Sequence, residues 1–87
     1  MIVIQAIDLC DMLKNAINNI NNNDEQYTKK EEINKAKYNA AKNTYKEANI
    51  MIKHFTINYD NNYNYEVINQ LMNTLNYKLK QIEKEIN

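Results

Sequence analysis

Five residue types are missing from this 87-residue chain: glycine, proline, serine, tryptophan and arginine. Without glycine and proline the chain lacks the strongest local breakers, which favours long helices joined by asparagine-rich turns over a sheet with many tight turns. Without serine and glycine it has neither a serine nucleophile nor a glycine-rich phosphate-binding loop, and no HExxH motif or Cys/His cluster occurs. We therefore predict a protein that works by binding and is not an enzyme.

Cysteine and histidine occur once each, as Cys10 and His54. A single cysteine cannot form an internal disulfide, and Cys10 falls on the apolar side of a predicted helix, which indicates a core residue. His54 has no second ligand at helical spacing, so neither a metal site nor a cofactor is predicted. The apolar residues 1–4 lack a basic flank and are soon followed by Asp8 and Asp11, which predicts no signal peptide and no membrane span. We expect a cytoplasmic protein.

Asparagine, isoleucine, lysine and tyrosine together make up more than half of the chain. Their codons are rich in A and T, so the composition indicates an AT-rich genome, which is one explanation for the many asparagines and tyrosines. Eleven basic residues balance eleven acidic residues, which argues against polyanion binding by the chain as a whole. The lysines concentrate in residues 27–55 and residues 1–26 are acidic, so the middle of the chain is its basic element.

A long central helix is predicted from Thr28 to Phe55, with outer bounds near residues 26 and 56. Small and apolar residues recur there every three or four positions: Ile33, Ala36, Ala40, Thr44, Ala48, Met51 and Phe55. This period places them on one helix face, and neighbouring residues widen that face enough for two packing partners. Thr28 with Glu31 matches a capping box, and Asn23 offers an alternative cap one turn earlier.

Amphipathic helices are predicted on both sides of the central one. The first covers about residues 2–20, with apolar residues at Ile2, Ala6, Leu9, Leu13, Ala16 and Ile20. Residues 1–4 could instead form a strand, but no partner strand is evident elsewhere in the sequence. The third helix covers about residues 64–86 and carries a strict heptad at Tyr65, Ile68, Met72, Leu75, Leu79, Ile82 and Ile86.

The sequence thus predicts an all-α fold with a single helical domain over residues 1–87. The expected architecture is an antiparallel three-helix bundle, or a helical hairpin, with a long central helix and a coiled-coil-like third helix. A strict heptad packs against another helix, which lies either in the same chain or in a second copy. Because so small a core has little margin, we expect a homo-oligomer, a dimer or higher.

The most informative surface feature is a row of four lysines on the central helix: Lys35, Lys42, Lys46 and Lys53. Their spacing places them on one helix face, beside Tyr38 and Tyr45. Ammonium groups next to tyrosine rings are typical of sites for phosphates or carboxylates, so these six residues are the predicted partner- or anion-binding site. The alternative is a solvated lysine face, or one that faces Asp8 and Asp11 of the first helix.

The connection from Thr56 to Asn64 is the second candidate surface. It is predicted to form a recognition loop with the residues Tyr59, Asn61, Asn62, Tyr63 and Tyr65. Tyrosine offers a large rigid contact area and asparagine offers adaptable hydrogen bonds, which is why both are common in binding loops. AT-rich codon usage supplies the same residues without any binding role. Asn62 or Asn64 is expected to cap the third helix.

These features predict a non-enzymatic binding protein with a protein partner. From its size and composition we expect a small phage or mobile-element accessory protein that inhibits a host (defence) protein. The inhibition would come from stoichiometric binding to an acidic or nucleic-acid-binding surface. One alternative is that the lysine and tyrosine residues sequester an anionic small ligand such as a nucleotide, or bind nucleic acid. Another is a structural, self-assembling coiled-coil subunit.

Overall fold

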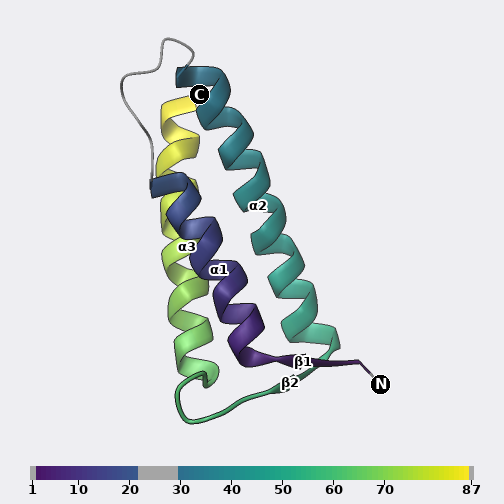
Figure 1. Ribbon diagram of the computed structural model, residues 1–87. Helices are drawn as coiled ribbons and strands as arrows, with labels where there is room; N and C mark the ends of the chain where they lie inside the picture. Colours follow the sequence, from purple (N-terminus) through teal and green to yellow (C-terminus); the bar gives the residue numbers. More distant parts are fainter. Residues whose placement is uncertain (1, 22–29, 87) are drawn as a thin grey trace.

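The computed structural model describes residues 2–21 and 30–86. Most of them belong to three helices and two short strands, in the order β1 (Val3–Gln5), α1 (Ala6–Asn21), α2 (Lys30–His54), β2 (Thr56–Asn58) and α3 (Tyr65–Ile86). Each helix packs against the other two along a molecule of 45 × 22 × 17 Å (Figure 1). The prediction of a mainly helical fold with three packed helices is confirmed, and the two strands are an addition to it.

The core lies where the apolar faces of the three helices meet. Its buried side chains are Ala6, Leu9, Cys10, Leu13, Ala16, Ile17, Ile20, Ala41, Ala48, Ile68, Met72, Leu75, Leu79 and Ile82. The large ones come from α1 and α3, whereas the buried residues between positions 35 and 54 of α2 are the alanines Ala41 and Ala48. An alanine has only a methyl group to accommodate, so the backbone of α2 can approach its neighbours closely. Among the described residues, the central helix therefore contributes the smallest side chains to the core.

The buried face of α2 differs from the predicted alanine stripe. Ala48 is buried as predicted, but Ala36 and Ala40 are exposed, and Ala41 takes the place expected for Ala40. Tyr38 and Tyr45 are half-buried and pack against the core. Two rings on one side of the helix rotate its buried face toward them, because a tyrosine ring buries far more apolar area than an alanine methyl group.

The expectation that residues 1–4 have no partner strand was wrong. β1 pairs in parallel with β2, in the register Val3 with Thr56, Ile4 with Ile57 and Gln5 with Asn58. The side-chain amide of Asn58 donates to Gln5 Oε1 at 2.8 Å, and Ile4 and Ile57 pack against the core. β-branched residues suit extended backbone, and this pairing explains why α1 begins at Ala6 and not near residue 2.

The heptad of α3 faces the core of its own chain. Its members from Ile68 to Ile82 are buried against the other two helices, whereas Tyr65 at its start is exposed. These residues already have packing partners within one chain. A second copy that bound this protein would have to use a different surface. The predicted caps of α2 at Thr28 and Asn23 lie outside the described residues.

Asn64 caps α3, as one of the two predicted candidates. Its side-chain oxygen accepts a hydrogen bond from the backbone N–H of Val67 at 3.0 Å, and its carbonyl accepts from Ile68 N–H at 3.2 Å. Substitution Asn64→Ala should lower the free energy of unfolding by about 1 kcal/mol, because the Val67 amide loses its partner at the helix end. Urea unfolding followed by circular dichroism measures this loss.

The matched control for the cap is Asn61→Ala. Asn61 is exposed in the same loop and makes no hydrogen bond with any described residue. Its replacement should change stability by less than about 0.5 kcal/mol. Equal losses in the two variants would mean that the loop tolerates alanine poorly in general and that the cap itself contributes little.

Candidate binding surfaces

The four predicted lysines do form one exposed row along α2. Lys35, Lys42, Lys46 and Lys53 are all exposed. The row is about 27 Å long at the helical rise of ~1.5 Å per residue. Within the described part of the chain, none of these ammonium groups forms an ion pair with a carboxylate. The alternative in which the row faces Asp8 and Asp11 therefore has no contact to support it.

Tyr38 belongs to the core edge more than to an open binding site. Its hydroxyl donates a hydrogen bond to Glu83 Oε2 on α3 at 3.1 Å, and the Lys42 ammonium lies 5.6 Å from the ring centroid. Tyr45, one helical repeat further on, is also half-buried and packs on the core. Both rings therefore hold α2 against its neighbours, and the carboxylate of Glu83 adds negative charge beside Lys42.

The predicted recognition loop is built around Asp60. One oxygen of its carboxylate accepts hydrogen bonds from the backbone N–H groups of Asn62 at 2.8 Å and Tyr63 at 2.7 Å. The Asp60 N–H donates to the Tyr63 carbonyl at 3.2 Å. These bonds close a tight turn that needs neither glycine nor proline. Asn61 and Asn62 are left exposed at its tip.

The three tyrosines of this loop have two different environments. Tyr63 packs against the core, and the Lys14 ammonium of α1 lies 5.5 Å from its ring centroid. Tyr59 and Tyr65 are exposed and meet edge to face, with ring centroids 6.5 Å apart and an interplanar angle of 74°. An edge-to-face pair holds two rings in place while most of their area stays in water. Of the predicted loop tyrosines, only these two offer a contact surface.

The loop lies against α1, where acidic groups gather. The Cys10 thiol is buried, and its burial raises its pKa. The Lys14 charge lowers that pKa, whereas the carboxylates of Asp11 and Asp60 raise it. All three charges must lie near the thiol to act on it, so the acid of the loop and the acid of α1 share one region. Sequence reasoning missed this juxtaposition because Asp11 and Asp60 are far apart in the chain.

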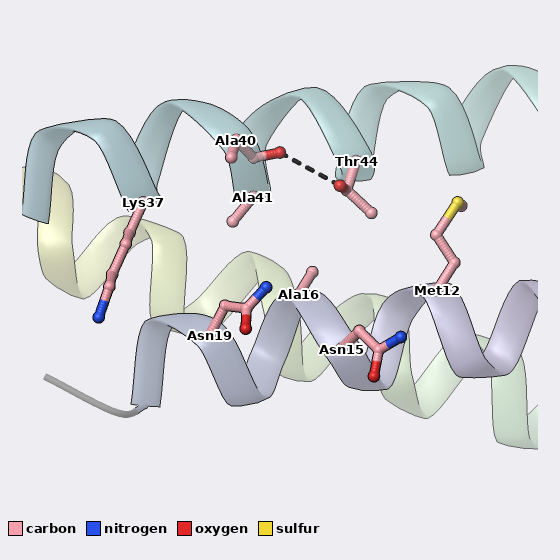
Figure 2. Close-up of a pocket in the computed structure, with 8 residues that line it drawn as sticks. All are labelled: Met12, Asn15, Ala16, Asn19, Lys37, Ala40, Ala41 and Thr44. Atoms are coloured by element: carbon pink, nitrogen blue, oxygen red, sulfur yellow. Dashed lines mark hydrogen bonds between the residues drawn. The ribbon is translucent and has the colours of Figure 1, made fainter. Parts of the chain in front are cut away.

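A shallow groove of about 530 Å³ lies between α1 and α2 (Figure 2). Eight residues line it: Met12, Asn15, Ala16 and Asn19 on α1 and Lys37, Ala40, Ala41 and Thr44 on α2. It exists because alanine side chains leave the space between the helices unfilled. The Thr44 hydroxyl donates to the Ala40 carbonyl at 3.1 Å. Lys37 is the one ionisable group among the described residues that line the groove.

No group of three histidine, cysteine, aspartate or glutamate side chains within 2–21 and 30–86 is arranged to hold a metal ion. None of the helices in these ranges is both long enough and apolar enough to cross a bilayer.

Comparison with known proteins found no matching family model, no matching curated protein and no matching solved structure.

Proposed function

We propose that this chain is a non-enzymatic binding protein whose lysine row docks on an acidic surface of a protein partner. The observation that carries the proposal is the row itself: four exposed ammonium groups on one helix face, with no ion pair to any described carboxylate. A rigid helix presents these charges at fixed spacing, and opposite charge on a partner would speed association and fix its register.

The partial burial of the two tyrosines on α2 favours a protein partner over a nucleotide or nucleic acid. Stacking on bases requires open ring faces. Tyr38 and Tyr45 are half-buried, and Tyr38 is bonded to a carboxylate that would repel a phosphate. A protein surface with spaced carboxylates needs only the lysines. We place this activity in a phage or mobile-element setting, where a small protein would inhibit a host protein by covering its acidic surface.

The double substitution Lys42→Glu with Lys46→Glu tests this proposal. Two charge reversals at the centre of the row should weaken binding to the partner about tenfold or more, because each lysine then repels the carboxylate that it met. The variants are used as bait in a host lysate, and the affinity for each captured protein is then measured by calorimetry. The wild-type complex should also weaken as salt is raised.

The matched control is Lys80→Glu with Lys84→Glu, which makes the same two charge reversals at exposed positions on α3. It should leave binding within about threefold of the wild type if the row on α2 is the contact. Equal loss in the two double variants would contradict the assignment to α2. Salt-sensitive binding to oligonucleotides, with no captured protein, would support the nucleic-acid alternative instead.

We further infer that helices consecutive in the chain run in opposite directions, α1 against α2 and α2 against α3, and that α3 packs in a coiled-coil-like manner. In support, Tyr38 in the first half of α2 bonds to Glu83 near the end of α3. Likewise Met51, near the end of α2, lines a hollow with Leu9, near the start of α1. Spin labels at Lys53 and Lys84 should then lie about 25 Å apart. A much shorter distance would exclude this arrangement.

A further inference from the structure

Large exposed apolar side chains gather at the end of the molecule that carries the strands. Ile7, Tyr59 and Tyr65 are exposed there, Tyr65 to 59%. Two of them have exposed acids next to them or four positions along the helix: Asp8 and Asp11 with Ile7, and Asp60 with Tyr59. Ile7 follows β1 and Asp60 follows β2, and the parallel register of these strands brings the two segments together. We call Ile7, Asp8, Asp11, Tyr59, Asp60 and Tyr65 together the tyrosine end.

The lysine row contains an apolar side chain of its own. Ile50 is 52% exposed, four residues after Lys46 and three residues before Lys53. These spacings place all three side chains on one face of α2. The lysine row therefore has an exposed isoleucine among its positive charges. An apolar centre with a charged rim is the usual anatomy of a contact between proteins.

The two surfaces are complementary to each other. We propose that the tyrosine end of one copy of this chain docks on the lysine row of a second copy, with Ile50 against the exposed rings and the lysines against the carboxylates. The chain has no net charge, yet its exposed charges are unevenly placed: the tyrosine end has three carboxylates, whereas the row on α2 has four lysines. Such separation makes a second copy an electrostatically suitable partner.

The contact joins two different surfaces, so it is head-to-tail. The docked pair still offers one free tyrosine end and one free lysine row, so growth continues unless the rotation closes a ring. Exposed ion pairs contribute little each and are screened by salt, so the association should be weak and most evident at low ionic strength. This self-association uses the lysine row, which we assign above to an acidic partner, but it does not require that partner. A second copy and the acidic partner would compete for the row.

Sedimentation velocity over a concentration series, at about 0.05 M and about 0.5 M salt, measures this association. The wild type should gain mass with concentration at low salt and return toward monomer at high salt. A row-blocked variant, Lys46→Gln with Ile50→Asn, and an end-blocked variant, Asp11→Asn with Tyr65→Asn, should each remain monomeric. Circular dichroism of each variant confirms that its helices are intact.

The decisive sample is an equimolar mixture of the two blocked variants. One retains its tyrosine end and the other its lysine row, so the mixture should form a 1:1 complex that cannot grow. The control variant Tyr77→Asn with Lys84→Gln loses the same kinds of side chain elsewhere on α3 and should associate like the wild type. A wild type that stays monomeric at low salt, or a mixture that forms no complex, would overturn the proposal.

The same variants separate this inference from the proposed function. The end-blocked variant keeps its lysine row and should still bind the acidic partner. A wild type that binds the acidic partner but does not self-associate would refute only the inference made here. Self-association without any acidic partner would refute only the proposed function.

Discussion

Replacing Leu75 by alanine should lower the free energy of unfolding by about 3 to 5 kcal/mol. Leu75 lies at the centre of α3 and is 0% exposed, so its removal leaves a cavity between three helices. A domain of this size has a total stability of roughly 4 to 13 kcal/mol. The variant should therefore unfold at a much lower urea concentration, which circular dichroism at increasing urea measures.

Tyr77→Ala, two residues away, is the matched control for Leu75. Tyr77 is 65% exposed, so its removal should change stability by less than about 1 kcal/mol. The pair also tests where the heptad packs. A loss below about 1 kcal/mol for Leu75→Ala would be too small for a fully buried leucine. If that variant also converted an oligomeric wild type to monomers, the heptad would join separate chains and would not form the core described above.

The Cys10 thiol should react with an aromatic disulfide reagent at least about 1,000-fold more slowly in the folded protein than in urea. The side chain is fully buried, so reagent reaches it mainly through opening of the core, and the ratio of rates reports the free energy of that opening. The raised pKa acts in the same direction because it lowers the thiolate fraction in the folded state. Absorbance of the released thiol follows the reaction.

An exposed thiol gives the reference rate: Asn15→Cys in a Cys10→Ala background should react at the same rate folded and unfolded. The raised pKa of Cys10 also links stability to pH. Above the ordinary thiol pKa the unfolded chain loses a proton that the folded chain keeps, so the free energy of unfolding falls as pH rises. Fast reaction of Cys10 in the folded protein would show that the core around α1 opens readily.

The helices could be predicted from the sequence because their apolar residues repeat over many turns. Leu9, Leu13 and the α3 heptad residues from Ile68 to Ile82 are buried as the period indicates, and the lysine row is exposed on one face. A long repeat averages out single exceptions, so the three helices were identified correctly even where their first residues were not. The N-terminal cap at Asn64 was also recognisable, because asparagine before an apolar run is a local signal.

Features that join distant parts of the chain could not be predicted from the spacing of apolar residues. The strand pair consists of three residues on each side, which is too short for an alternating pattern to stand out from the flanking helices. The only available signal was that both segments hold β-branched residues next to a helix end. The Tyr38 hydroxyl bonds to Glu83, which is 45 residues away, and no local pattern indicates that contact.

Pairing of β1 with β2 also affects the order in which this chain folds. The two strands are separated by the whole of α1 and α2, so a loop of about fifty residues must close before they can meet. Helical turns need only near neighbours and form on a microsecond scale or faster. During synthesis the first strand must therefore wait, unpaired, until Asn58 has emerged from the ribosome. Amide hydrogen exchange during refolding should record this delay as late protection of the strand amides.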